Sequence, residues 1–135
     1  IGLHMCRGNL KGMWMGEGGY EPIAEQLFNQ LDVDTILMEY DSKRAGDFAP
    51  LRHVPIGKLV VLGLISSKSP MLESKSEVKS QIDTAAAIIP LEQLALSPQC
   101  GFSSGSGDGQ VLDMDATRRK LELIVELAHE VWGTV

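Results

Sequence analysis

His4 and Cys6 lie near the start of the chain, in the segment Ile-Gly-Leu-His-Met-Cys. This mostly apolar segment predicts a β-strand, and the Arg7-Gly8-Asn9 stretch that follows predicts the turn that ends it. Because side chains alternate between the two faces of a strand, the imidazole and the thiol project from the same face. Histidine and cysteine together suit a borderline-soft ion such as zinc. On this segment alone, a buried cysteine beside a hydrogen-bonded histidine is the favoured interpretation, so a zinc site requires further ligands.

A carboxylate lies near the end of the next expected strand. Residues 34–40 are mostly apolar, which is typical of a strand buried on both faces, yet they include Glu39. A carboxylate in such a strand is costly unless another group pairs with it. A salt bridge to Arg7, Arg44 or Arg52 is one interpretation, and a metal ligand or an acid at the carboxyl end of the strand is the other.

A second thiol follows a later strand. Residues 94–97 predict a short strand, and Cys100 lies just beyond its carboxyl end. His4, Cys6, Glu39 and Cys100 would then reach one edge of a parallel sheet from three strands. Two thiolates, an imidazole and a carboxylate form a plausible zinc set, although this scattered spacing is less specific than paired CxxC motifs.

The remaining segments predict the elements that must position these residues. Apolar residues at helical spacing predict helices over about 23–31 and over 74–89, the second with a Ser74/Glu77 capping box. They also predict a last helix that is capped by Asp113 or Asp115 and ends near Gly133. The β-branched run 58–65 predicts the clearest strand, and its Gly63 predicts a close approach of another backbone segment. The glycine-rich loop 12–19 exposes Trp14 either as a lid or as a residue packed on a helix.

Composition narrows the class of protein. The chain has 135 residues, a net charge of −6, and 44% hydrophobic residues, which fits a single domain with a real core. The acidic balance provides no basic face for nucleic acid, and no apolar run is long enough to span a membrane. With only two cysteines and no signal peptide, a reducing cytoplasmic location is expected. The chain begins with Ile1 inside an expected strand, which suggests a fragment of a longer protein.

The order of elements predicts an α/β fold of parallel strands with covering helices. No GxGxxG fingerprint follows an expected strand, and neither a P-loop nor a GxSxG nucleophile elbow is expected. Four strands are too few to close a (β/α)8 barrel, which takes eight in roughly 250 residues, so residues 1–135 are expected to form the C-terminal half of such a barrel. In that arrangement Val60, Leu62 and Leu64 are expected to lack the facing side chains of a closed barrel, and the two open sheet edges to promote self-association.

Several motifs carry a resemblance that covers nearly the whole chain. They are His4–Asn9, Gly18–Tyr20, Leu37–Asp41, Arg44–Phe48, Val61–Leu64, Leu96–Phe102 and Glu130–Gly133. On these motifs the chain resembles the C-terminal part of cobalamin-independent methionine synthase, and most closely its shorter single-barrel relatives. The loop Ser103–Gln110 departs from that pattern.

The resemblance implies a zinc site and a reaction. It implies that His4, Cys6, Glu39 and Cys100 bind Zn2+, and that the zinc activates a thiol such as homocysteine to accept a methyl group from a methyltetrahydrofolate-type donor in methionine biosynthesis. Asp41, Arg44 and Asp47 are open to either a substrate-orienting or a structural role.

Two alternatives remain open alongside the methyltransferase. One is zinc-dependent alkyl transfer to another thiol, as in the relatives that open epoxides with coenzyme M. The other is a non-catalytic zinc-binding remnant. The donor-binding surface is expected in the missing N-terminal barrel half, so the fragment alone is expected to be inactive.

Overall fold

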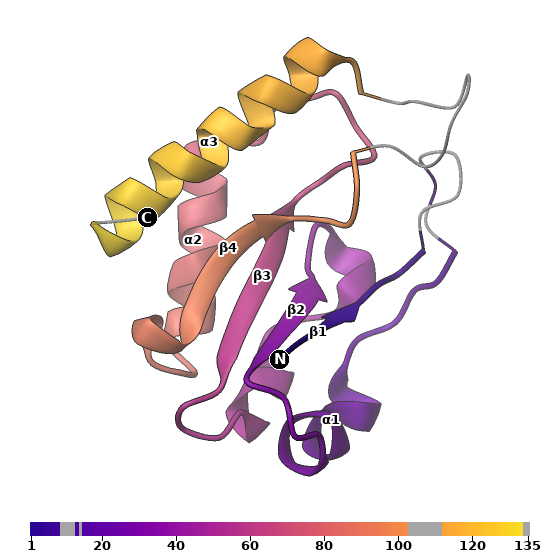
Figure 1. Cartoon of the computed structure of the whole chain (residues 1–135), viewed down its shortest axis with the longest axis vertical. Helices are drawn as coiled ribbons and strands as arrows, with labels where there is room; N and C mark the ends of the chain where they lie inside the picture. Colours follow the sequence, from indigo (N-terminus) through magenta and orange to yellow (C-terminus); the bar gives the residue numbers. More distant parts are fainter. Residues whose placement is uncertain (9–12, 14, 103–111, 134–135) are drawn as a thin grey trace.

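Four parallel strands with helices packed against one face build the molecule, and Figure 1 shows this arrangement. The computed structural model describes residues 1–8, 13, 15–102 and 112–133. The strands lie in the order β1-β2-β3-β4. Their bounds are β1 Gly2–Met5, β2 Thr35–Glu39, β3 Leu59–Ile65 and β4 Leu94–Pro98. The α-helices are α1 Ala24–Gln30, α2 Lys75–Ala86 and α3 Met114–Trp132, and short 3-10 helices cover Glu21–Ile23, Lys43–Ala45, Ala49–His53 and Leu91–Gln93. The expected α/β fold of half a (β/α)8 barrel is therefore confirmed.

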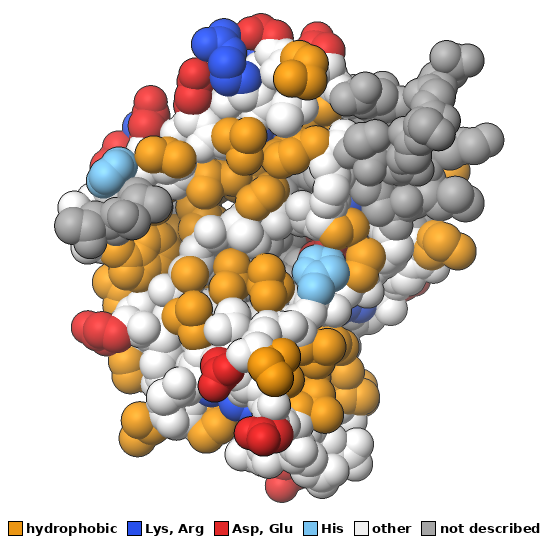
Figure 2. Space-filling model, viewed as in Figure 1, with side chains coloured by type: hydrophobic (Ala, Val, Ile, Leu, Met, Phe, Trp, Pro, Cys, Tyr) orange, Lys and Arg blue, Asp and Glu red, His pale blue; other side chains and the backbone are white. Residues whose placement is uncertain are grey.

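The register of the sheet divides its residues between two faces. Leu3 is aligned with Ile36 and Ile36 with Val60, whereas His4 is aligned with Leu37 and Leu37 with Val61. Because neighbouring rows alternate in direction, the first row packs under the helices and the second lies on the open face. Figure 2 shows hydrophobic side chains gathered on this uncovered face of the sheet.

The core lies between the sheet and the helices. Its strand residues pack in one cluster with apolar side chains from all three helices, namely Phe28, Val78, Ile82, Leu123 and Leu127. Val60, Leu62 and Leu64 belong to this cluster and are at most 2% exposed. The expectation that they face an unfilled barrel interior is therefore wrong. A strand made only of apolar residues does not indicate which alternate side chains face the helices. In the structure, Val61 is half-buried and lies on the open face.

The helix ends follow the sequence signals in part. Asp113 is the N-cap of α3 and accepts a hydrogen bond from the Ala116 N–H at 2.7 Å, and Gly133 ends that helix in the left-handed conformation. Ser74 is the N-cap of α2, but its hydroxyl contacts Ser76 Oγ at 2.8 Å and makes no capping bond. The expected capping box is therefore not formed, and α2 ends earlier than predicted.

The close backbone approach expected at Gly63 is confirmed. A Cβ at this position would lie 3.0 Å from the Met38 carbonyl oxygen and 3.4 Å from Glu39 Cα. Glycine therefore allows β2 and β3 to approach beside the Glu39 carboxylate. None of the described helices is long and apolar enough to cross a lipid bilayer.

Candidate metal centre

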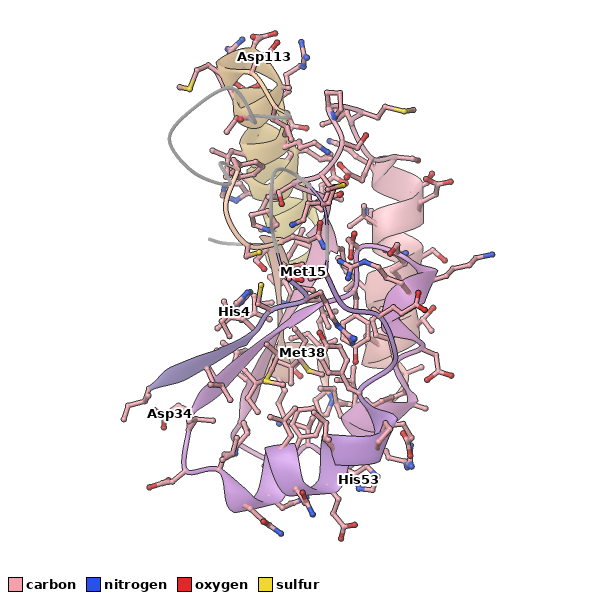
Figure 3. All side chains as sticks on the ribbon, turned by 90° about the vertical axis from the view of Figure 1, so that its right-hand side faces the viewer. His4, Met15, Asp34, Met38, His53 and Asp113 are labelled. Atoms are coloured by element: carbon pink, nitrogen blue, oxygen red, sulfur yellow. The ribbon has the colours of Figure 1, made fainter. Side chains whose placement is uncertain are left out.

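The ends of three strands deliver the four candidate ligands to one edge of the sheet. Cys6 directly follows β1, Glu39 is the last residue of β2, and Cys100 follows β4 by two residues. His4 lies within β1, two residues before Cys6, so their side chains project from the same face. Figure 3 shows the His4 side chain on the side of the sheet away from α2. Parallel strands present their carboxyl ends at a common edge, which explains why residues far apart in sequence meet here.

The four side chains converge. One potential ligand atom from each of them lies within 4.8 Å of those of the other three. Cys6 Sγ is 3.4 Å from Cys100 Sγ, and His4 Nε2 is 3.7 Å from Glu39 Oε1. The expected convergence is thus confirmed. His4 and Cys6 are exposed, whereas Glu39 is buried, so the cluster opens to the surface on its β1 side.

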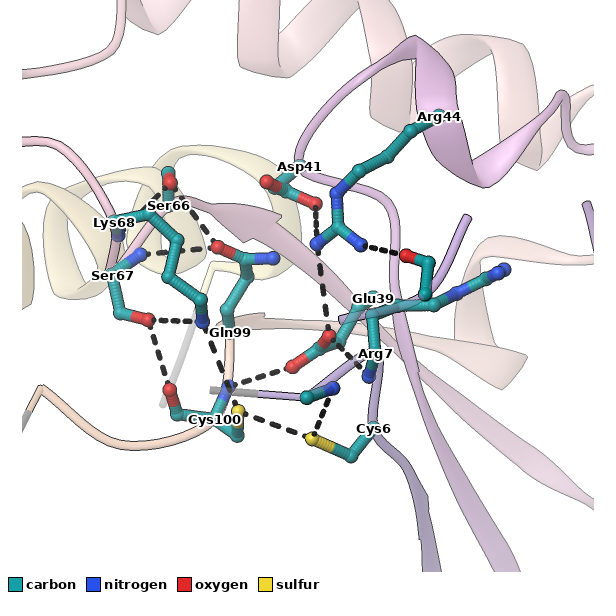
Figure 4. A network of polar contacts seen from close by, with 12 residues as sticks. Cys6, Arg7, Glu39, Asp41, Arg44, Ser66, Ser67, Lys68, Gln99 and Cys100 are labelled. Atoms are coloured by element: carbon teal, nitrogen blue, oxygen red, sulfur yellow. Dashed lines mark hydrogen bonds and ion pairs between the residues drawn. The ribbon is translucent and has the colours of Figure 1, made fainter. Parts of the chain in front are cut away.

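Glu39 connects the two segments that carry the thiols, as Figure 4 shows. Its Oε1 accepts a hydrogen bond from the Cys100 N–H at 3.0 Å, and its Oε2 accepts one from the Arg7 N–H at 2.9 Å. The carboxylate therefore holds the segment after β1 and the segment after β4 in place from the strand between them. A buried carboxylate accepts such bonds because they replace the hydrogen bonds of water.

Of the three arginines considered as partners for Glu39, Arg44 is the one whose guanidinium forms a long ion pair with it. Its guanidinium is 3.9 Å from Glu39 Oε2 and donates to Asp41 at 3.0 Å. Arg7 contributes its backbone N–H and stacks its guanidinium on the Tyr20 ring, 4.2 Å from the centroid. Arg52 pairs instead with Glu21. The salt bridge and the ligand interpretation of Glu39 are thus compatible, since Arg44 lies near Oε2 while His4 lies near Oε1.

The surroundings shift two ligand pKa values in opposite directions. Burial raises the pKa of the Glu39 carboxyl, but hydrogen bonds from Cys100 and Arg7 to the ionised form outweigh it and hold the pKa below its ordinary value. Burial, with the adjacent Glu39 carboxylate and Cys6 thiol, raises the pKa of the Cys100 thiol to about 12. At neutral pH the metal-free chain therefore holds an ionised Glu39 and a protonated Cys100.

Sequence reasoning missed the polar groups that surround the ligands. Tyr20 is buried, and its hydroxyl accepts the Glu39 N–H at 3.0 Å, which fixes the end of β2. Gln99 is buried next to Cys100, and the Lys68 ammonium lies 3.9 Å from Cys100 Sγ. Lys68 belongs to the loop that follows the clearest strand, and that position at a carboxyl strand end is the signal that could have identified it.

The residues that were open to a substrate-orienting or a structural role lie in different surroundings. Asp41 is held by Arg44 next to Glu39, and its burial raises its pKa while Arg44 offsets this only in part. Asp47 accepts the Ala49 N–H at 3.0 Å, which is a local turn contact. Trp14 and the loop Ser103–Gln110 lie outside the described residues.

The donor set fits zinc. Ligand atoms around a tetrahedral zinc lie about 3.3 to 3.8 Å apart, since Zn–N and Zn–S bonds measure about 2.0 to 2.3 Å. The Cys6–Cys100 and His4–Glu39 distances of 3.4 and 3.7 Å fall within this range. Two sulfur donors exclude the hard cations Mg2+ and Ca2+ as good matches. The fold and this cluster therefore define a class: half barrels with a thiol-rich candidate metal centre at the carboxyl end of the strands.

Comparison with known proteins gives the family. Residues 1–130 match the family model described as cobalamin-independent synthase, catalytic domain. The chain belongs to this family, whose relatives include methyltransferases. It is 44% identical over 133 residues to the uncharacterized protein YxjG of Bacillus subtilis, with 98% of the chain and 35% of YxjG covered. It therefore spans about a third of the length of this relative.

Two solved structures and a named enzyme are also similar to this chain. A putative vitamin-B12-independent methionine synthase from Listeria monocytogenes superposes with a TM-score of 0.73 at 34% identity, over 98% of this chain and 35% of that one. A B12-independent methionine synthase from Shewanella, solved with selenomethionine, shares the fold with a TM-score of 0.75 at 22% identity, over 98% and 38%. The 5-methyltetrahydropteroyltriglutamate–homocysteine methyltransferase of B. subtilis is 29% identical over 104 residues, or 77% of this chain and 12% of that enzyme.

Proposed function

We propose that this chain supplies the zinc-binding part of an S-methyltransferase, which moves a methyl group from a methyltetrahydrofolate-type donor to a thiol such as homocysteine. The observation that carries the proposal is the convergence of an imidazole, two thiols and a buried carboxylate within 4.8 Å. Free thiols at both cysteines fit a reducing, cytoplasmic setting.

Each group of the cluster has a defined part in this proposal. His4 Nε2, Cys6 Sγ, Glu39 Oε1 and Cys100 Sγ are the atoms that would hold the metal, while the Arg7 and Cys100 N–H groups orient the carboxylate. When bound, zinc lowers the pKa of a thiol and holds the thiolate, which is the nucleophilic form. The exposed side at His4 and Cys6 leaves a path for an acceptor from solvent.

The methyl transfer balances as a simple displacement. The acceptor sulfur forms a bond to the methyl carbon, the carbon–nitrogen bond of the donor breaks, and its electron pair remains on the donor nitrogen, which then takes a proton. We propose that the donor-binding surface belongs to the remaining part of the barrel, because the chain spans only about a third of the length of its relative YxjG.

Cobalt substitution tests this proposal on the 135-residue chain itself. The Co2+-loaded chain is titrated with homocysteine and, separately, with mercaptoethanesulfonate, and the sulfur-to-cobalt absorption is recorded. We expect the absorption to grow with one thiol equivalent, because the metal would either expand to five ligands or exchange one of its four protein ligands for the added sulfur. A spectrum that does not respond to either thiol would indicate a closed, structural metal site and contradict the proposal, and the preferred thiol distinguishes homocysteine from coenzyme M chemistry.

A further inference from the structure

Lys68 directs a positive charge at the candidate metal centre, and Figure 4 shows its ammonium between Ser67 and Cys100. Its Nζ donates to Ser67 Oγ at 2.9 Å and to Cys100 Sγ at 3.9 Å. Among the described residues it makes no ion pair with a carboxylate. Lys75, Lys79 and Lys120, in contrast, each pair with a glutamate.

The loop that carries Lys68 is fastened to the segment that carries Cys100. Gln99 Oε1 accepts hydrogen bonds from Ser66 Oγ at 3.1 Å and from the Ser67 N–H at 3.2 Å. Ser67 Oγ donates to the Cys100 carbonyl oxygen at 2.9 Å, and Gln99 and Ser67 are at most 3% exposed. Buried contacts of this kind fix a loop, so the ammonium is held beside the thiol and does not depend on the free rotation of a surface lysine.

Both candidate thiol ligands have an N–H donor. The Gly8 N–H donates to Cys6 Sγ at 3.1 Å, which corresponds to the Lys68 contact on Cys100. A donor on a thiolate withdraws negative charge from the sulfur, and a sulfur that is more acidic is also a weaker nucleophile. This matters in a methyltransferase of the proposed kind, because the two protein sulfurs and the acceptor sulfur compete for the same methyl group.

We propose that Lys68 is a specificity-determining residue that suppresses methylation of Cys100, so that the acceptor thiol is the sulfur that reacts. The inference rests on the proposed function, since it assumes a methyl transfer at this centre. Attack by Cys100 on the donor would form S-methylcysteine, break the donor carbon–nitrogen bond, and replace an anionic sulfur with a neutral thioether. A thioether carries no charge to offset that of zinc, so such a side reaction would weaken the centre.

Methyl iodide tests this role without the natural donor. The zinc-loaded 135-residue chain is treated with the reagent, whose carbon bonds to a sulfur as iodide leaves, and mass spectrometry reads the zinc and the methylated cysteine. We expect Lys68→Met to raise the rate of Cys100 methylation by at least about threefold, as for the loss of one charge-assisted hydrogen bond. The Cys6 rate is expected not to change, because its donor is the backbone of Gly8.

Two further variants separate charge from shape. Lys68→Arg is expected to keep Cys100 methylation slow, because a cation remains. Lys79→Met removes the same charge from α2, where Lys79 pairs with Glu130, and is expected to leave both cysteine rates unchanged. If Lys68→Met releases zinc, Lys68→Gln serves in its place, because it removes the charge and keeps a polar chain.

The outcomes for the two proposals are distinguishable. A zinc-loaded Lys68→Met or Lys68→Gln chain with the wild-type Cys100 rate would overturn the role of Lys68 and leave the zinc site intact. A Lys68→Arg chain that reacts as fast as Lys68→Met would also overturn it, since charge would then have no effect. A wild-type chain that retains no zinc would instead contradict the proposed function itself.

Discussion

The two faces of the sheet are built from alternate residues of the same strands and have different roles. Val60 and Leu62 of β3 are fully buried under the helices, whereas Val61 between them lies half-buried on the open face. The open face also carries His4 and, at the strand ends, the other candidate ligands. The covered face therefore provides the core that stabilises the chain, and the open face provides the candidate chemistry. Substitutions on one face should leave the function of the other largely unchanged.

The largest expected effect contrasts two neighbouring residues of β3. Leu62→Ala should lower the free energy of unfolding of the metal-free chain by about 2–5 kcal/mol, because it leaves a cavity in a closely packed core. Val61→Ala should cost less than about 1 kcal/mol, since its side chain is only partly buried. Urea denaturation followed by circular dichroism measures both. Equal losses would contradict the division between the faces.

The next effect concerns the thiols of the open face. Cys6→Ser and Cys100→Ser should each lower zinc affinity by at least about a hundredfold, because a serine hydroxyl is a far poorer zinc ligand than a thiolate. The thermal midpoint of the metal-free chain should change little for Cys6, which is exposed. Competition with a chromophoric chelator and thermal melts on the same samples separate these effects. Normal zinc binding with lost stability would mean that the cysteine is only a packing residue.

A smaller effect follows from the protonation of Cys100. Burial raises the pKa of this thiol to about 12, so zinc binding at neutral pH must release its proton. Zinc affinity should therefore increase as pH rises, by at least about tenfold per unit between pH 6 and 8. Chelator competition at several pH values measures the slope. An affinity that does not change with pH would show that no thiol is deprotonated on binding.

The smallest expected effect concerns association through the uncovered face. β1 and β4 are the edge strands of the sheet, and Val61 and Leu37 lie exposed in part between them. We expect the isolated chain to self-associate at micromolar concentrations, and Val61→Lys to weaken this association severalfold without unfolding the chain. Light scattering over a concentration series measures it. A wild-type chain that remains monomeric throughout would contradict the expectation.

The sequence predicted where the strands lie but not which of their side chains face the helices. The segments 34–40, 58–65 and 94–97 were identifiable because each is a short apolar run between turn residues, and the structure places strands there. The assignment of Val60, Leu62 and Leu64 to the barrel interior failed. The run Leu-Val-Val-Leu-Gly-Leu-Ile contains no polar residue that could mark one face, and only the packed helices decide it.

The candidate ligands were predictable and their supports were not. His4, Cys6, Glu39 and Cys100 could be identified because each has ligand chemistry and lies in or just beyond the last residues of a strand. Lys68 lies in a serine-rich loop whose composition indicates only a connection. Its position next to Cys100 depends on Gln99 and Ser67, which meet only when β3 and β4 pair.

X-ray absorption at the zinc edge tests the central claim most directly. The chain is loaded with one equivalent of Zn2+, and the scattering atoms bound to the metal are counted with and without homocysteine. The account predicts two sulfurs at about 2.3 Å and two nitrogen or oxygen atoms at about 2.0–2.2 Å, with a third sulfur when homocysteine is added. A spectrum with only nitrogen and oxygen ligands would contradict this account. So would a spectrum with two sulfur ligands that gains no third sulfur when homocysteine is added.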